Sequence, residues 1–237
     1  MSLGDSKQAV REHVWSTLIE AGVCPDDARG HIPNFIGSDR AAQLLASTNA
    51  WRHSRTLKTN PDKAQLPVRA RVLTDRKILC MAVPRLAIAE PFFLIDPMNP
   101  AFLPSESGSS AVATQVSPRV RINEMPHIDL VVSGSVAVNH QGVRLGKGAG
   151  YADIEIGLLI EAGLITDNTV IATTVHSLQV LDQLLPEQQH DCRVDLIVTE
   201  QEIIKCPRSP RPPGLIWPTL SAEQIAAIPV LNAKRSR

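Results

Sequence analysis

The feature that most constrains the fold of this chain is a strand, a glycine-rich loop and a helix that follow one another in its second half. Residues 128–138 are almost continuously apolar, residues 142–150 contain alternating glycines, and residues 151–162 have a helical pattern that ends before Gly163. A long apolar run that leads into a turn and a helix is typical of a strand buried on both faces. We therefore expect this segment to belong to a largely parallel sheet.

Further segments repeat the alternation of strands and helices. Strands are predicted over 56–59, 68–73, 78–83, 170–175 and 194–199, and helices over 6–21, 40–48 and 177–185. Strands that alternate with helices in this way imply a sheet covered on both sides. The expected fold class is α/β, with three layers and a largely parallel sheet that has helices on both faces.

The length of the chain favours one domain followed by a tail. Its 237 residues predict a single α/β domain over 5–206. Residues 84–118 have no sustained period and are expected to form a long irregular excursion, of a kind that often covers a site. Five prolines between residues 207 and 218 predict that 207–237 is an extended, proline-rich C-terminal tail along the surface.

Charge and cysteine content argue against several classes of protein. The 24 basic residues balance 24 acidic residues, so no overall field would attract nucleic acid or an anionic membrane. The 4 cysteines are dispersed without a Cys-x-x-Cys pair, which favours free thiols and a reducing compartment. No apolar run approaches the roughly 20 residues that span a bilayer. We expect a cytoplasmic protein that acts on a small molecule, with no nucleic-acid or membrane partner.

The helix predicted over 6–21 places two cations beside its apolar side. Val10, Val14 and Leu18 form a stripe at the helical period, and Lys7 and Arg11 lie on it or next to it. One interpretation is that their stems pack along the edge of the core while their charged heads reach water or a carboxylate. The other is that both cations face an anion at the end of the sheet. The pattern alone favours the first interpretation.

The loop that follows the apolar run has the composition of a phosphate-binding loop. Gly146, Gly148 and Gly150 permit positive φ angles and a close approach of an anion to the backbone amides. Arg144 and Lys147 add positive charge, and the next helix adds the positive end of its dipole. The spacing matches neither the P-loop nor the dinucleotide fingerprint. A tight strand-to-helix turn with solvated basic residues explains the same pattern, so both interpretations stay open here.

Asp153 is equally ambiguous. A carboxylate in the first turn of a helix stabilises that helix by about 0.3–1 kcal/mol. A carboxylate beside a phosphate site could also hold Mg2+. The histidines and cysteines show no ligand spacing typical of a structural transition-metal site, so none is expected.

Residues 142–153, Gly-Val-Arg-Leu-Gly-Lys-Gly-Ala-Gly-Tyr-Ala-Asp, resemble the signature of the 5-formyltetrahydrofolate cyclo-ligase (methenyltetrahydrofolate synthetase) family. Two more segments match in the right order: Lys7-x-x-x-Arg11 near the N-terminus, and the run from His190-Asp191 to Glu200. Together the matches frame nearly the whole chain. The resemblance implies a NagB/RpiA-like α/β fold.

The resemblance also implies an activity, that of an ATP- and Mg2+-dependent ligase in folate metabolism. In this family ATP transfers its γ-phosphate to the formyl oxygen of 5-formyltetrahydrofolate, and ring closure with loss of phosphate gives 5,10-methenyltetrahydrofolate. The catalytic cations implied are Lys7, Arg11, Arg144 and Lys147. The nucleotide-binding residues implied are Lys7, Arg11, Arg144, Gly146, Lys147, Gly148, Gly150 and Tyr151, with Asp153 beside Mg2+.

The sequence departs from the family where a folate should bind. Ala152 stands in place of the second tyrosine of the signature, and residues 58–62 offer no convincing acidic counterpart to the family's Glu-x-x-Thr. These departures make the chain more similar to a paralogous branch, the methenyltetrahydrofolate synthetase domain-containing proteins. Some such paralogues are linked to thiamine metabolism.

Two hypotheses therefore stay open. The favoured one is an ATP-dependent, cyclo-ligase-like enzyme that phosphorylates a formyl or similar oxygen of a folate-like heterocycle. The alternative is a divergent paralogue that binds nucleotide or phosphate without cyclo-ligase activity. A deep second pocket lined from residues 52–86 and open to the glycine-rich loop would favour the enzyme, and a filled one would favour the binding protein.

Overall fold

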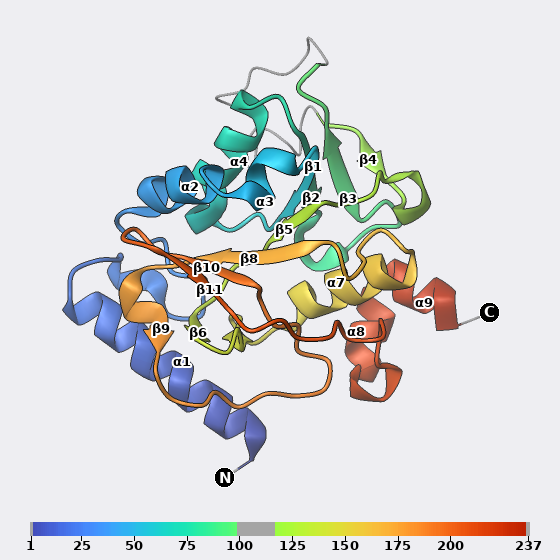
Figure 1. Cartoon of the computed structure of the whole chain (residues 1–237). Helices are drawn as coiled ribbons and strands as arrows, with labels where there is room; N and C mark the ends of the chain where they lie inside the picture. The colour runs from blue at the N-terminus through green and yellow to red at the C-terminus, as the bar shows by residue number, and fades with distance from the viewer. Residues whose placement is uncertain (1, 99–116, 236–237) are drawn as a thin grey trace.

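The computed structural model describes residues 2–98 and 117–235, and a large mixed sheet lies at its centre (Figure 1). The sheet has 8 strands in the order β11-β10-β8-β5-β1-β2-β3-β4. They are β1 (Thr56–Thr59), β2 (Ile78–Ala82), β3 (Phe92–Ile95), β4 (Arg119–Val120), β5 (Leu130–Val132), β8 (Val170–Thr174), β10 (Leu196–Val198) and β11 (Ile203–Lys205). Strands β10, β8, β5, β1 and β2 run parallel, β11 and β3 run antiparallel to them on either side, and β4 pairs antiparallel with β3 at the edge. The expected, largely parallel sheet is confirmed.

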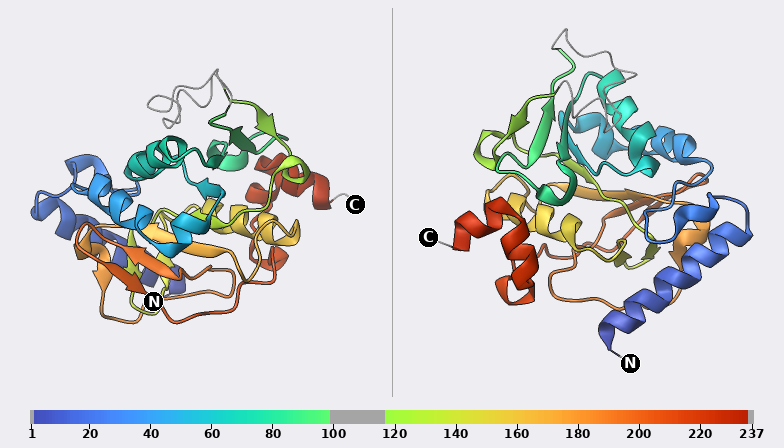
Figure 2. Two further views of the ribbon diagram at one scale, coloured as in Figure 1. Left: turned by 45° about the horizontal axis from the view of Figure 1, so that its top comes forward. Right: turned by 180° about the vertical axis from the view of Figure 1, so that it is seen from behind.

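Helices cover both faces of the sheet, as the three-layer α/β class requires (Figures 1 and 2). They are α2 (Ser38–Ala46), α3 (Asn49–His53) and α4 (Leu66–Thr74) on one side, and α7 (Tyr151–Glu161), α8 (Ala222–Ala227) and α9 (Pro229–Arg235) on the other. On the first side, Leu45 and Val72 pack with strand residues such as Leu57. On the second, Leu158 and Leu231 pack in one cluster with strand residues that include Val131 and Ile171. The sheet is therefore apolar on both faces, as expected for a buried parallel sheet.

The N-terminal helix belongs to a smaller unit. Strands β6 (Ala137–Asn139), β7 (Arg144–Leu145) and β9 (Val180–Leu181) form a second sheet in the order β7-β6-β9, beside helix α1 (Leu3–Glu20). Val14, Trp15 and Leu18 of α1 are buried with Ala137 and Leu145 of this sheet. The apolar stripe predicted for the helix is therefore the side by which α1 attaches to the protein.

Most predicted elements are present with small shifts at their ends. The strands expected over 56–59, 78–83, 170–175 and 194–199 are β1, β2, β8 and β10. The helices expected over 6–21, 40–48 and 151–162 are α1, α2 and α7. Each of these segments contains apolar or β-branched residues in a pattern that fits its element, which is the signal that located it.

The strand predicted over 68–73 is wrong, because these residues form helix α4. Pro67 stands in the first turn of α4, where its missing N–H costs no hydrogen bond. Val68, Val72 and Leu73 are buried at helical spacing. A short segment rich in valine has no strong period of its own, and packing against the sheet decides its structure.

The apolar run 128–138 is not one strand but two. Its first part is β5 in the large sheet, and its last part begins β6 in the small sheet. Between them, Ser135 Oγ lies 2.9 Å from Thr173 Oγ1, and Gln179 Nε2 donates hydrogen bonds to the carbonyl oxygens of Ser135 and Val136. These side-chain hydrogen bonds satisfy the backbone where the chain leaves one sheet for the other.

Two other expectations also need correction. The helix predicted over 177–185 is a 310 turn, Ser177–Gln179, followed by strand β9, because Val138 pairs with Val180 in the small sheet. The irregular excursion predicted over 84–118 contains β3, whose Phe92 and Phe93 are buried, while residues 99–116 lie outside the described residues.

The C-terminal region is extended only in part. Residues 207–216 contain neither helix nor strand, but the chain then forms a 310 turn (Trp217–Thr219) and helices α8 and α9. An extended conformation is therefore wrong beyond residue 216, since Ile228 and Leu231 are fully buried in the core beside α7. None of the described helices is long and apolar enough to cross a membrane.

Candidate functional site

A cavity of about 730 Å³ lies where the parallel strands β1, β2 and β5 end. Its walls come from α1, from the glycine-rich loop and the start of α7, from the segments that follow these strands, and from the loop at 188–191. Ligands of α/β proteins commonly bind at this end of the sheet, and small-molecule sites usually have this size. The cavity is therefore the candidate site.

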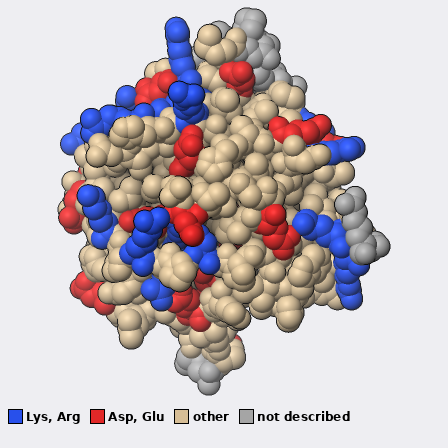
Figure 3. Space-filling model, turned by 45° about the vertical axis from the view of Figure 1, so that its right-hand side comes forward, with Lys and Arg blue, Asp and Glu red and all other residues tan. Residues whose placement is uncertain are grey.

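The four cations singled out from the sequence all line this cavity. Lys7, Arg11, Arg144 and Lys147 come from three separate elements, α1, β7 and the glycine-rich loop. On the face of the molecule in Figure 3, basic and acidic side chains are interspersed, so this face has no large patch of one sign. The positive groups gathered in the cavity are thus a local feature of a chain without net charge.

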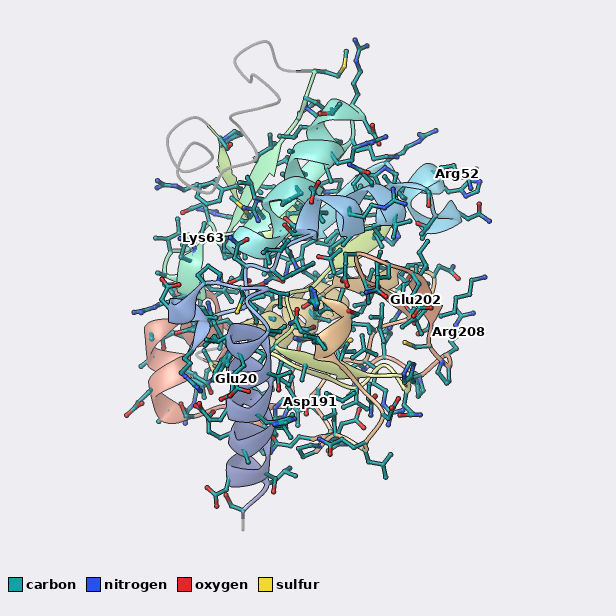
Figure 4. All side chains as sticks on the ribbon, turned by 90° about the vertical axis from the view of Figure 1, so that its left-hand side faces the viewer. Glu20, Arg52, Lys63, Asp191, Glu202 and Arg208 are labelled. Atoms are coloured by element: carbon teal, nitrogen blue, oxygen red, sulfur yellow. The ribbon has the colours of Figure 1, made fainter. Side chains whose placement is uncertain are left out.

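Helix α1 directs two of these cations into the cavity, where each contacts a group from a distant segment. The Lys7 ammonium forms an ion pair with Asp191, which lies beside α1 in Figure 4. Arg11 Nε donates a hydrogen bond to the carbonyl oxygen of Gly146 at 2.7 Å. Burial lowers the pKa of Arg11, and the nearby Asp191 partly offsets this. The carboxylate partner fits the interpretation in which the charged heads of these residues reach a carboxylate. The cavity fits the interpretation in which both cations face an anion at the end of the sheet.

Arg144 is the most deeply buried of the four cations. Its residue is only 4% exposed, its Nη2 lies 2.6 Å from Asp153 Oδ1, and its Nη1 donates to the carbonyl oxygen of Gly134 at 3.3 Å. Burial opposes the charge, but Asp153 and other negative groups outweigh burial, so the pKa of Arg144 is raised. Its buried Nε has no hydrogen-bond partner within the described parts of the chain. The guanidinium is therefore permanently charged and has a donor to spare.

The glycine-rich loop has the backbone geometry that glycine allows. Gly148 and Gly150 have φ values of 106° and 73°, in the left-handed region that other residues rarely adopt. Gly150 is the N-cap of α7, and no side chain caps this helix. The first amides of α7 are thus left without a side-chain partner at the cavity wall, where an anion could accept their hydrogen bonds. Tyr151, the first residue of α7, also lines the cavity.

Lys147 connects the loop to the segment after β1. Its Nζ lies 3.5 Å from Asp62 Oδ1, and its side chain is 42% exposed. An ion pair this exposed contributes little to stability, about 0–1 kcal/mol. Lys147 can therefore turn towards an anion in the cavity at small cost.

The inner end of the cavity contains buried polar groups, of which the sequence pointed to the segment of Asn60 but not to Glu155. Glu155 of α7 and Asn60 after β1 both line the cavity and are both buried. Glu155 Oε2 accepts hydrogen bonds from Lys58 Nζ and, at 3.0 Å, from Asn60 Nδ2. Burial raises the pKa of Glu155, against the opposing effect of Lys58. The sequence contains one signal that could have identified Glu155 as a cavity residue. It follows Tyr151 by one helical turn, so both residues lie on the same side of α7.

The candidate metal ligand Asp153 lines the cavity, where Arg144 and the backbone N–H of Cys192 contact its Oδ1. The parts of the chain described by the structure contain no group of three or more histidine, cysteine or carboxylate side chains that could hold a metal ion. Mg2+ in nucleotide sites is usually held by one or two carboxylates together with substrate phosphates. Asp153 alone fits that arrangement if phosphates supply the remaining ligands.

The second pocket that was expected to separate the hypotheses is open. Asn60, Asp62, Val83 and Arg85 line the same cavity as the glycine-rich loop. Ala152 of α7 lines the same cavity. The site therefore has a cationic end and an inner polar end within one space.

Comparison with known proteins places this architecture in a family. Residues 4–200 match the model of the 5-formyltetrahydrofolate cyclo-ligase family. The chain is 37% identical to a methenyltetrahydrofolate synthase domain-containing protein of Mus musculus and 34% identical to that of Homo sapiens, over 99% and 100% of its length. It spans only 64% and 63% of those relatives.

A solved structure shows the same fold. The NMR structure of 5,10-methenyltetrahydrofolate synthetase from Aquifex aeolicus is 22% identical and superposes with a TM-score of 0.56, covering 86% of this chain and 94% of its own. The relatives confirm the resemblance to the domain-containing branch, and the family model covers most of the chain. This chain belongs to the 5-formyltetrahydrofolate cyclo-ligase family.

Proposed function

We propose that this chain binds Mg2+ and ATP at the cationic end of the cavity and transfers a phosphoryl group to an oxygen of a folate-like heterocycle at the inner end. The observation that carries the proposal is that Lys7, Arg11, Arg144 and Lys147 line one cavity together with a glycine-rich loop that has left-handed backbone. Cations that repel one another gain most from converging where an anion binds between them.

Two features of the described residues fit a polyphosphate. The buried Nε of Arg144 has no partner in the described chain, and the first turn of α7 has no capping side chain. Both are donors, and a phosphate offers several acceptor oxygens for each. Asp153 would lie beside Mg2+, which supplies charge neutralisation when it is bound with the phosphates.

The residues of this chain would mainly position groups and stabilise charge. Arg144 is fixed by Asp153 and Gly134, so its guanidinium is pre-organised for the phosphates. Lys7 contacts Asp191 and Gln188, Lys147 contacts Asp62, and both ammonium groups can share their charge with a ligand. Phosphoryl transfer depends on such positioning and electrostatic stabilisation rather than on a protein nucleophile.

The alternative is a paralogue that binds nucleotide without this chemistry. It is favoured by the ion pairs of Lys7, Arg144 and Lys147, because each cation already has a carboxylate partner. The continuous cavity from the glycine-rich loop to Asn60 and Arg85 favours the enzyme, since a binding protein needs no second space.

The experiment that tests the proposal measures ATP hydrolysis that depends on 5-formyltetrahydrofolate, with ADP release coupled to NADH oxidation. A parallel thermal-shift measurement with ATP and Mg2+ reports binding without turnover, because a ligand of the folded state raises its stability. ADP release that depends on the second substrate supports the enzyme. A thermal shift without such release supports the binding protein, and no shift with millimolar ATP refutes the nucleotide site.

A further inference from the structure

We propose that Gln224 is a positioning residue for the nucleotide site, because it holds the peptide between Ala149 and Gly150 in the orientation that lets the Gly150 N–H donate to a phosphate. Gln224 lies in the C-terminal segment, beyond residue 200, where the match to the family model ends. The inference rests on the proposed function and deepens it, since it adds to the site a part of the chain that the glycine-rich motif does not contain.

The C-terminal segment is built into the domain beside α7, where helices α8 and α9 lie (Figures 1 and 2). Ile228 and Leu231 are fully buried in the same cluster as residues of α7. At the last turn of α7, Glu161 accepts hydrogen bonds from the backbone N–H of Leu215 at 3.1 Å and from Lys234 Nζ at 2.7 Å. Apolar packing and these polar contacts therefore hold α8 in place relative to α7.

Gln224 of α8 joins this segment to the glycine-rich loop. Its Nε2 donates a hydrogen bond to the carbonyl oxygen of Ala149 at 3.4 Å, and its Oε1 accepts one from the backbone N–H of Ser221 at 2.9 Å. The contact with Ser221 requires an acceptor, so the donor of the amide group is the atom that faces the loop. A Cβ added to Gly150 would lie 3.3 Å from the same Nε2. Gln224 thus contacts the loop just before α7 begins.

The loop has little else to fix its conformation at this point. Ala149 and Gly150 are exposed, and the bond from Gln224 is the one side-chain hydrogen bond to residues 148–150 within the described chain. Gly150 has a φ of 73°, but glycine adopts negative φ about as readily. Rotation of the Ala149–Gly150 peptide plane would therefore meet little steric resistance. The contact with Gln224 selects one orientation.

The orientation of this peptide determines whether the loop presents a donor or an acceptor to an anion. The C=O and N–H bonds of a trans peptide point in opposite directions, so the Gly150 N–H points away from Gln224. No described residue accepts a hydrogen bond from this N–H. Ala149 and Gly150 line the cavity, so the N–H is available to a phosphate there. A rotated peptide would present its carbonyl oxygen instead and repel the phosphate.

The test compares two variants that each lose one half of the cap of α8. Gln224→Met removes the donor to Ala149 without adding charge, whereas Ser221→Ala removes only the acceptor of the Gln224 backbone N–H, at 3.1 Å. Isothermal titration calorimetry measures the affinity for the ATP analogue AMP-PNP with Mg2+. We expect Gln224→Met to weaken binding about fivefold and Ser221→Ala less than about twofold.

A second readout needs no ligand. In NMR spectra of the ligand-free protein, the amide resonance of Gly150 should shift or broaden in Gln224→Met and stay in place in Ser221→Ala. If Gln224→Met does not fold, Gln224→Glu replaces it, because a glutamate keeps an acceptor for the Ser221 N–H and lacks the donor.

Equal affinities of the Gln224 and Ser221 variants, or an unchanged Gly150 resonance when the Gln224 donor is lost, would overturn the inference. If wild type binds no AMP-PNP, the proposed function fails, and the Gly150 resonance still decides whether Gln224 holds the loop.

Discussion

The two ends of the cavity differ in how their charged groups are held. At the glycine-loop end, Lys7 and Lys147 each pair with one carboxylate, Asp191 and Asp62, at the cavity wall. At the inner end, Lys58 and Glu155 are buried and paired with each other. At the glycine-loop end the partly exposed Lys147 can leave Asp62 for a ligand, whereas the inner end must keep its ion pair intact, because breaking a buried pair is strongly destabilising. The glycine-loop end is therefore suited to a mobile polyanion, and the inner end is suited to a ligand that is held in a fixed position.

The comparison also separates what is shared with the family from what is particular to this chain. The cations of the motif that resembles the family signature line the cavity, and so do Ala152 and Asn60, where the sequence departs from the family. Phosphate binding makes similar demands on any phosphoryl-transfer enzyme. Recognition of the second substrate, which the proposed function requires, makes demands that differ from one substrate to another.

The largest expected effect would break the cationic end. Arg144→Ala removes a buried guanidinium with several donors, so ATP affinity should fall by about 100-fold, which corresponds to two charge-assisted hydrogen bonds. Isothermal titration calorimetry with Mg2+ and ATP measures the change. Arg29→Ala, which breaks an exposed ion pair with Glu12, is the control. Equal losses in the two variants would show that Arg144 has no special role in binding.

The second prediction concerns the backbone of the same end. Gly148→Ala forces a side chain into a left-handed conformation, at a cost of about 1–2 kcal/mol, and should weaken ATP binding by about tenfold. The matched control is Gly146→Ala, because Gly146 has no positive φ and an added Cβ would meet only Arg144 Nη1, at 3.5 Å. If the two substitutions have the same effect, the loop conformation does not matter for binding.

The third prediction concerns the inner end. We expect wild type to form 5,10-methenyltetrahydrofolate more slowly than the roughly 1 per second that is typical of enzymes. Ala152→Tyr should raise this rate by about threefold to tenfold, since an aromatic contact adds about 0.5–1.5 kcal/mol. The absorbance of the product gives both rates. Wild-type turnover at ordinary enzymatic rates would mean that the departure at Ala152 has no functional consequence.

The smallest effect concerns pH and the buried pair. Folding raises the pKa of Glu155 above its ordinary value of 4.5, mainly through burial. Such a group contributes stability that is fully present below that ordinary value and is lost as pH rises through the folded value. The free energy of unfolding of wild type should therefore fall with rising pH relative to Lys58→Met/Glu155→Gln. Urea unfolding across the acidic range measures it, and parallel pH profiles would contradict the burial effect.

The sequence predicts the cationic end better than the inner end for a physical reason. Lys7 and Arg11 lie one helical turn apart, and Gly146, Gly148 and Gly150 are close in sequence, so local periodicity and motif spacing reveal them. Lys58 and Glu155 are 97 positions apart and meet only because β1 and α7 are adjacent in space. No local pattern contains such a pair.

The same distinction explains the errors in the fold. The segments 151–162 and 170–175 were predicted well because their apolar periods are long or their residues are strongly β-branched. Residues 68–73 and 177–185 were assigned to the wrong element, since their structure depends on packing against the large sheet and on pairing with β6. Tertiary contacts override weak local preferences in segments this short.

Helix α1 has a consequence for how firmly one wall of the cavity is held. Val14, Trp15 and Leu18 attach the second half of the helix to the small sheet, whereas Lys7 lies in the turns before them and reaches the rest of the protein through polar contacts. Helix ends with few buried contacts open locally with much less free energy than global unfolding requires. Fraying of these turns would withdraw one wall of the cavity while the sheet stays folded. The rate of amide hydrogen exchange at these turns would then change with ligand occupancy. Thermal unfolding of the whole protein would hardly report this local opening.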